Sequence, residues 1–155
     1  MVHAGRETGM NVTNSTSGNG GLGLSAQDER AIAALLIAYG CAIDRRDWGK
    51  FRACFAEDCE CDYGSFGAWQ GPAAITQYMR KAHADVGQTL HRITNIEAWT
   101  EDGQVHARSY VDALLMPLAA GGPIHRGVGH YDDRLARTAA GWRIARRQFV
   151  PVQIV

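Results

Sequence analysis

The sequence predicts an α+β domain in which a strongly curved, mixed or antiparallel β-sheet wraps around N-terminal helices. Two observations support this fold class. Apolar residues recur at helical spacing in the first half of the chain, and four long strand-like segments joined by short turns fill the second half. Helices followed by a run of strands are typical of α+β proteins. The length of 155 residues suits a single domain.

Three helices are expected before the long strands. Ser25 has the residue type of an N-cap, and apolar residues from Ile32 to Ile43 recur at helical spacing, which predicts a helix over residues 26–46. Asp47 is expected to cap a second, shorter helix. Pro72 suits the first position of a third helix that runs to about residue 84.

The strands are predicted from alternation and from turn residues. Cys59, Cys61 and Tyr63 alternate with acidic residues, which is the spacing of a strand, and a second short extended segment covers residues 66–70. Four longer strands are expected after Gly87, over residues 89–99, 105–117, 124–138 and 142–154. Long strands joined by short turns favour a curved antiparallel sheet.

Residues 1–24 differ in composition from the rest of the chain. They are rich in Gly, Ser, Thr and Asn, which predicts a loosely ordered tail before a domain over residues 25–155. Residues 18–23 match the dinucleotide-binding pattern GxGxxG, but no strand-like segment precedes them. Because that motif requires a preceding strand, no cofactor is predicted.

Composition excludes several classes of function. Sixteen basic and sixteen acidic residues give a net charge of zero, which argues against a nucleic-acid partner. No apolar stretch approaches the roughly 20 residues of a membrane span. The first residues lack the layout of a secretory signal, so a cytoplasmic location with free cysteines is expected. The spacing of Cys54, Cys59 and Cys61 is not that of a zinc site, so no metal is predicted.

Asp44 and His91 are the first candidates for chemistry. Asp44 lies at the end of the first predicted helix among small and apolar residues, where burial is expected to raise its pKa. His91 lies in a predicted strand, with Ile93 on its own side. A carboxylate bonded to one imidazole nitrogen would make the other a better base. Each residue also has a structural interpretation, an arginine ion pair for Asp44 and a satisfied core or surface position for His91.

Tyr63 and His125 are the supporting candidates. The Tyr63 hydroxyl could polarise a carbonyl or orient a water, or the ring could simply fill the core. His125 and His130 have opposite parity on their strand, so at most one points inward, and His125 is the favoured one. Arg147, in the last strand, is expected to form a structural ion pair.

Together these residues resemble the SnoaL-like branch of the nuclear transport factor 2-like superfamily, which has a cystatin-like fold. The resemblance runs through Ala31–Asp47, Phe55–Asp58, Asp62–Gly64, Thr89–Asn95 and Gly141–Ile144. It implies a curved sheet that forms a cone with an apolar pocket. Superfamily members such as scytalone dehydratase and hexachlorocyclohexane dehydrochlorinase use an Asp–His dyad, whose positions Asp44 and His91 match. Tyr63 resembles a dehydratase tyrosine that helps to hold a water, and His125 resembles that enzyme's second active-site histidine.

Two functions follow as hypotheses. The first is a cofactor-independent lyase of the dehydratase type, or an isomerase, that removes a proton from a small hydrophobic, cyclic or aromatic molecule. The second is a non-catalytic ligand-binding module or assembly subunit that resembles the β subunits of ring-hydroxylating dioxygenases. Apolar residues on both faces of the segment 105–118 also predict a homo-oligomer, a dimer or trimer.

Overall fold

The computed structural model describes residues 23–155. In it the helices precede the long strands, as the sequence predicts. The expected tail and its GxGxxG pattern lie, apart from residues 23 and 24, outside the described residues. The elements in chain order are α1 (Ala26–Asp44), α2 (Trp48–Arg52), β1 (Phe55–Asp62), a single 3₁₀ turn η1 (Gly64–Phe66), β2 (Ala68–Gln70), α3 (Pro72–Ala82), β3 (Val86–Glu101), β4 (Gln104–Pro117), β5 (His125–Thr138) and β6 (Gly141–Ile154).

Local sequence determines both ends of α1. The backbone N–H of Asp28 donates to the hydroxyl of Ser25 at 3.1 Å, so Ser25 is the N-cap that its residue type predicts. The helix ends at Asp44, two residues before the predicted end. Arg46 takes a φ of 56°, in the left-handed region, which turns the chain away from the helix axis. Asp44 therefore occupies the last position of α1.

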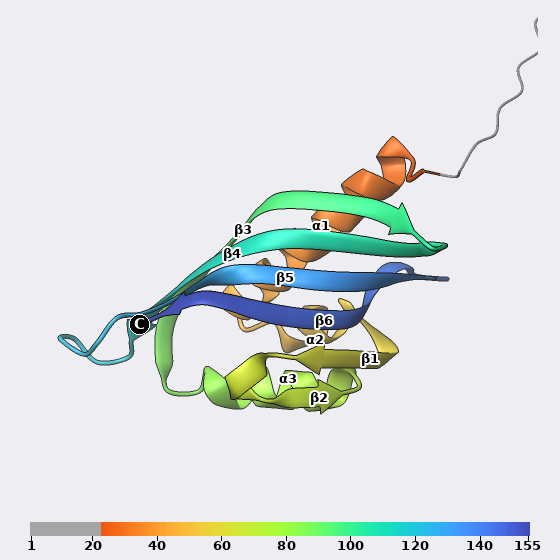
Figure 1. Ribbon diagram of the computed structural model, residues 1–155. Helices are drawn as coiled ribbons and strands as arrows, with labels where there is room; N and C mark the ends of the chain where they lie inside the picture. The colour runs from red at the N-terminus through yellow and green to blue at the C-terminus, as the bar shows by residue number, and fades with distance from the viewer. Residues whose placement is uncertain (1–22) are drawn as a thin grey trace, which may run out of the picture.

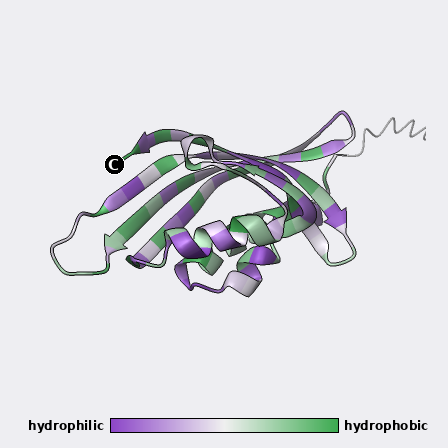
Figure 2. Cartoon of the chain, turned by 90° about the horizontal axis from the view of Figure 1, so that it is seen from below, coloured by the Kyte–Doolittle hydropathy of each residue, from purple (hydrophilic) through white to green (hydrophobic). Residues whose placement is uncertain are grey.

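The six strands form one sheet in the order β2-β1-β6-β5-β4-β3. Neighbouring strands are antiparallel except β1 and β6, which pair in parallel. Figures 1 and 2 show the sheet arching over the three helices, which lie on its concave side. A register irregularity between Thr94 and Glu97, where Asn95 has a φ of 48°, marks a bulge that bends β3. The predicted α+β fold with a curved sheet is confirmed.

The core lies between the concave face of the sheet and the helices. The apolar stripe of α1 supplies Ile32, Leu36 and Ile43, all fully buried. Phe51 of α2 and Phe55 of β1 stack on this stripe, with ring centroids 5.2 Å apart. Burial of such side chains contributes about 1.5–3 kcal/mol each. The helices are therefore held to the sheet mainly by apolar contacts.

One ion pair is buried completely inside this core. The guanidinium of Arg147 donates two hydrogen bonds to the carboxylate of Asp133, at 2.8 and 2.6 Å, and neither side chain is exposed. The guanidinium also lies over the rings of Tyr39 and Tyr131, at 4.2 and 4.0 Å from their centroids. The structural ion pair predicted for Arg147 is thus present, and its partner is Asp133.

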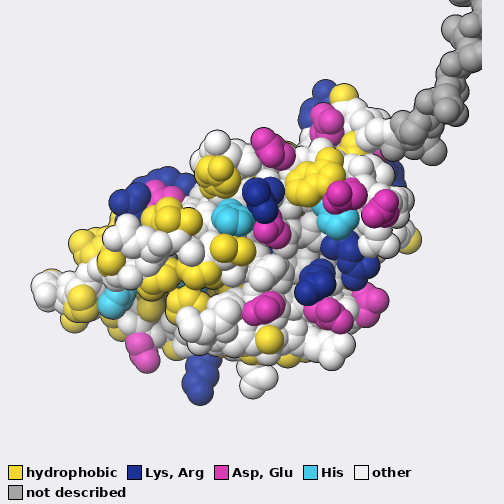
Figure 3. Space-filling model, in the orientation of Figure 1, with side chains coloured by type: hydrophobic (Ala, Val, Ile, Leu, Met, Phe, Trp, Pro, Cys, Tyr) yellow, Lys and Arg dark blue, Asp and Glu magenta, His cyan; other side chains and the backbone are white. Residues whose placement is uncertain are grey.

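The convex face of the sheet carries charged and apolar side chains side by side (Figure 3). Arg108 forms a bidentate pair with Asp132, while Leu90 and Tyr110 are 49% and 50% exposed. The homo-oligomer that the sequence analysis expects on this face stays a prediction.

None of the helices described by the structure combines the length and the apolar character that crossing a bilayer requires.

Asp132 and Asp133 allow the buried pair to be tested against an exposed one. Substitution Asp133→Ala leaves Arg147 charged and buried without a partner, so we expect a loss of about 3–5 kcal/mol in the free energy of unfolding. Asp132→Ala removes only surface contacts, with Arg108 and His130, and should cost less than about 1 kcal/mol. Urea denaturation of both variants measures the difference. Equal losses would contradict the importance of the buried pair.

Candidate active site

A cavity of ≈270 Å³ lies under the concave face of the sheet, where it meets α1 and α3. Its walls are mostly apolar, and Ala82, Val111, Ala113, Leu115, Phe149 and Ile154 supply much of that surface. The polar side chains in the lining are two histidines and several tyrosines: His83, His91, Tyr39, Tyr63, Tyr78 and Tyr131. Such an apolar pocket with a few polar groups suits a small hydrophobic ligand.

Asp44 and His91 meet beside this cavity. The Nδ1 atom of His91 lies 2.7 Å from Oδ1 of Asp44, and the backbone N–H of His91 donates to Oδ2 at 2.9 Å. Among the described residues, Asp44 forms no ion pair with Arg45 or Arg46, the partners that a purely structural role would favour. The last residue of α1 is therefore fixed to β3 through both carboxylate oxygens.

This geometry determines the protonation of the pair. Burial raises the pKa of Asp44, but hydrogen bonds from His91 and Thr89 outweigh it, and the pKa lies below its usual value. The raised pKa expected from the sequence is wrong, because the sequence does not reveal these donors. An ionised carboxylate accepts the Nδ1–H of His91, so that in the neutral form of this ring the lone pair is on Nε2.

Two further residues hold the carboxylate in place. The Thr89 hydroxyl donates to Oδ1 of Asp44 at 2.9 Å and accepts a hydrogen bond from Arg46, also at 2.9 Å. Arg46 in turn donates to the backbone carbonyls of Ile43 and Gly87. Thr89 was not singled out from the sequence, and Arg46 was considered only as an ion-pair partner of Asp44. Thr89 could have been found, since it shares the parity of His91 on the same strand.

Gly40 lets α1 approach β3 at this point. A Cβ atom at position 40 would lie 3.1 Å from Cγ1 of Ile93 and 3.2 Å from both Cβ and the carbonyl oxygen of His91. Those distances are shorter than ordinary van der Waals contacts, so a side chain would force the helix and strand apart. The glycine one turn before Asp44 thus sets the spacing of the Asp44–His91 pair.

Tyr63 belongs to a chain of three phenol groups. The Tyr39 and Tyr63 hydroxyls are 3.0 Å apart, and those of Tyr39 and Tyr131 are 3.5 Å apart. Burial raises the pKa of all three well above the usual value, so they are neutral. Three hydroxyl protons serve two mutual hydrogen bonds, which leaves one proton to donate. Tyr39 and Tyr131 were not singled out from the sequence, because their spacing is that of ordinary core residues.

Comparison with known proteins places the fold of this chain in a family. The profile of the SnoaL-like domain matches residues 25–148. The chain belongs to this family. No curated protein matches it significantly.

Three solved structures show how widely the fold of this SnoaL-like domain is shared. A protein proposed to be a scytalone dehydratase, from Novosphingobium aromaticivorans, is 23% identical with a TM-score of 0.74, over 81% of this chain and 85% of that one. A type 2 hexachlorocyclohexane dehydrochlorinase, LinA, is 17% identical with a TM-score of 0.75, over 83% and 88%. An NTF2-like protein with a cystatin-like fold, also from N. aromaticivorans, is 24% identical with a TM-score of 0.69, over 82% and 83%. These likenesses show the fold.

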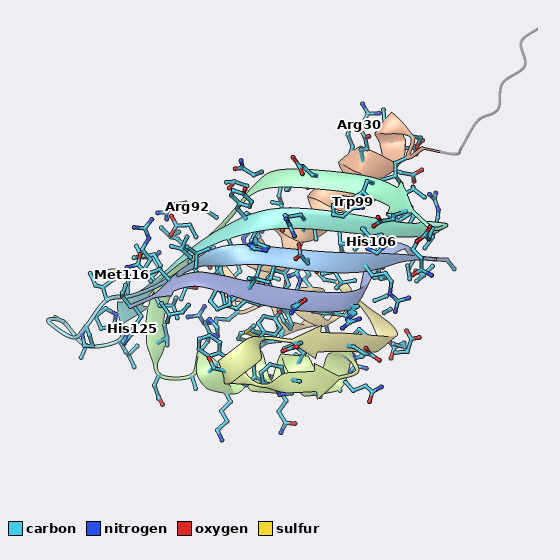
Figure 4. The ribbon with its side chains drawn as sticks, in the orientation of Figure 1. Arg30, Arg92, Trp99, His106, Met116 and His125 are labelled. Carbon is cyan, nitrogen blue, oxygen red and sulfur yellow. The ribbon has the colours of Figure 1, made fainter. Side chains whose placement is uncertain are left out.

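His125 does not reach the cavity of the SnoaL-like domain. It is the first residue of β5 and pairs in register with Leu115, but its side chain is exposed at the end of the sheet, near the C-terminus (Figure 4). The cavity wall on this strand begins at Gly127. His130 points the other way and lies 3.5 Å from Asp132. The opposite directions of His125 and His130 were predicted correctly from their positions on the strand. The sequence does not show, however, how far along β5 the cavity extends.

His83 is the histidine that the sequence analysis missed. It follows α3 directly, is 8% exposed, and its Nδ1 lies 2.9 Å from the carbonyl oxygen of Met79. Its ring centroid is 5.9 Å from that of His91. Burial lowers the pKa of His83, and the neighbouring His91 and Arg46 lower it further. A residue at a helix end belongs to no apolar periodicity, so the pattern gave no signal for it.

Metal ligands do not gather in the described part of the chain. Over residues 23–155, no three His, Cys, Asp or Glu side chains lie close enough to share an ion. Cys54, Cys59 and Cys61 are buried free thiols. The polar groups in the cavity lining are imidazoles and phenols, and the Asp44 carboxylate lies behind one of the imidazoles.

Acid stability should reveal the neutral state of His83. Its pKa is below 6.5 in the folded protein and ordinary in the unfolded chain, so the unfolded chain binds more protons between the two values. Stability is lost as the pH falls below 6.5. The substitution His83→Leu removes this contribution, so we expect the free energy of unfolding of the variant to rise relative to wild type from about pH 7 to about pH 5. Urea titrations at each pH measure it, and parallel profiles would contradict a lowered pKa.

Proposed function

We propose that this SnoaL-like domain is a cofactor-independent lyase of the dehydratase type, or an isomerase, that acts on a small hydrophobic carbonyl compound. The observation that carries the proposal is the 2.7 Å contact between Asp44 and Nδ1 of His91 beside an apolar cavity. A carboxylate at this distance fixes the tautomer of His91 and stabilises its imidazolium form. Nε2 of His91 is then the base that the cavity offers to a ligand.

The reaction follows from this placement. Nε2 of His91 takes a proton from the carbon next to the carbonyl, and the electron pair of that C–H bond moves into an enolate. The enolate then expels a hydroxide from the adjacent carbon as a new C=C bond forms. The hydroxide takes the proton back from His91 and leaves as water, which restores the neutral imidazole. In an isomerase, the same proton would return to a different carbon.

The enolate oxygen requires a hydrogen-bond donor, and the tyrosine chain is the best candidate. A terminal hydroxyl, that of Tyr63 or Tyr131, has a proton left over after the two mutual hydrogen bonds with Tyr39. Because burial keeps these phenols neutral, the proton is available for donation. Fixed donors aimed at a developing negative charge are among the largest contributions to catalysis.

A non-catalytic role has less support. A subunit that served only for assembly would need neither a cavity in its cone nor a carboxylate committed to a histidine. The open space of ≈270 Å³ argues against a role in assembly alone, and the pairing of Asp44 with His91 rather than with an arginine favours an enzyme over a module that only binds a ligand. The dehydratase and dehydrochlorinase among the similar structures are consistent with elimination chemistry.

The dyad is tested by removing either partner. We expect Asp44→Asn and His91→Gln each to slow turnover by about 10²- to 10⁴-fold. Suitable probes are aromatic β-hydroxy ketones such as the aldol adduct of benzaldehyde and acetone, whose dehydration gives an ultraviolet-absorbing enone. Exchange of the proton next to the carbonyl in D₂O, followed by NMR, detects the base even where elimination is slow. His125→Gln is the matched control and should keep the wild-type rate. Unchanged exchange in both dyad variants would exclude the mechanism.

The tyrosine chain predicts a difference between single and double variants. In Tyr63→Phe, the two remaining hydroxyls share one hydrogen bond and still have a proton to spare, so the rate should fall by less than about tenfold. The double variant with Tyr63→Phe and Tyr131→Phe leaves only the fully buried Tyr39, and should lose about 10²-fold. Tyr110→Phe, on the convex face, is the control for phenol removal. A double variant as active as this control would rule out the phenol donor.

A further inference from the structure

The cavity contains a second imidazole whose hydrogen-bonding state can be deduced. Nδ1 of His83 lies 2.9 Å from the carbonyl oxygen of Met79, one turn earlier in α3. A carbonyl oxygen can only accept, so Nδ1 carries the hydrogen. In the neutral ring, Nε2 of His83 then has a lone pair and no hydrogen. It is a hydrogen-bond acceptor.

That acceptor has no partner in the described part of the protein. Nε2 of His83 is buried, yet no donor among residues 23–155 reaches it. Buried polar atoms in native proteins almost always have a partner, so an orphan acceptor needs an explanation. One edge of the ring is bonded to α3, and the indole of Trp48 packs nearby with its ring centroid 6.2 Å away. His83 also lines the cavity, which is the space from which a donor can come.

The protonation of His83 distinguishes its role from that of His91. Burial keeps the pKa of His83 below its usual value, and among the charged groups that influence it, His91 and Arg46 lower the pKa while Asp44 raises it. Among residues 23–155, no carboxylate bonds to Nδ1 of His83, in contrast to Nδ1 of His91. His83 is therefore a weak base that accepts a hydrogen bond and has no Nε2 proton to give to a leaving group.

We propose that Nε2 of His83 accepts a hydrogen bond from a hydroxyl group of the ligand, and that this contact selects hydroxylated ring compounds. The hydroxyl held by His83 is one that the reaction retains. It is distinct from the group that leaves with the help of His91, because departure requires a proton that His83 does not supply. As a statement about substrates this rests on the function proposed above, whereas the binding contact itself does not.

Two ring compounds of equal shape test the contact without turnover. β-Naphthol and β-methylnaphthalene differ by a hydroxyl in place of a methyl group, and their affinities can be measured by fluorescence titration. We expect the ratio of the two affinities to fall about tenfold in His83→Leu relative to wild type, the usual effect of one lost hydrogen bond. The ratio should be retained in His91→Leu. A ratio that falls in His91→Leu and stays unchanged in His83→Leu would overturn the inference.

A measurement on the wild-type protein guards against misfolding of the variant. With nitrogen-15 histidine, the Nε2 signal of His83 should start at the position of an unprotonated ring nitrogen and shift when β-naphthol is added. β-Methylnaphthalene should leave it in place. An equal response to both compounds, or to neither, would contradict the hydrogen bond. Proton exchange in the Asp44 and His91 variants is independent of these titrations, so the proposed function and the ligand contact can fail separately.

Discussion

The junction between the end of α1 and the middle of β3 determines the form of the cavity. Asp44 contacts β3 through three hydrogen bonds, from the side chain of Thr89 and from the ring and backbone of His91. Gly40, one turn earlier, removes the side chain that would hold the helix away from the strand. With this junction fixed, α1 runs along the concave face of the sheet, and its residue Tyr39 forms part of the cavity wall.

This junction is unfavourable for a helix by itself. A carboxylate in the last turn lies near the negative end of the helix dipole, where a cation would be preferred. Three hydrogen bonds offset that repulsion well enough to keep the pKa of Asp44 below its usual value. Arg46, in a left-handed conformation, holds Thr89 and the first residues of β3 in position. The C-terminus of α1 therefore combines a left-handed residue, Arg46, with a carboxylate at the unfavourable end of the helix dipole. Hydrogen bonds to β3 hold this anion in a fixed position.

The sequence could predict the elements and the contact between Asp44 and His91, but not the shape of the cavity. Helical spacing and strand parity are local properties, so α1 and the inward direction of His91 were predictable. The extent of the cavity depends on strand register and sheet curvature, which are set by distant contacts such as the parallel β1–β6 pair. The prediction therefore chose the correct face of β5 for His125, but this residue lies at the start of the strand, before the cavity wall begins. His83 belongs to no apolar periodicity, so the sequence did not single it out, whereas Thr89 shares the strand parity of His91 and could have been found.

The polar groups of the cavity limit what a ligand can look like. Two ring nitrogens, on His83 and His91, offer lone pairs, and the tyrosine chain offers one proton. The charged side chains behind these groups offer no counter-charge to a ligand, because each has a partner within the protein. Asp44 is paired with His91, and Arg147 is paired with Asp133. An ionic ligand would lose its hydration without gaining a counter-charge, which is expensive in an apolar site. The ligand proposed above, a neutral compound with a carbonyl oxygen and a retained hydroxyl, would satisfy the donor and the second acceptor, and would leave His91 free to take the proton.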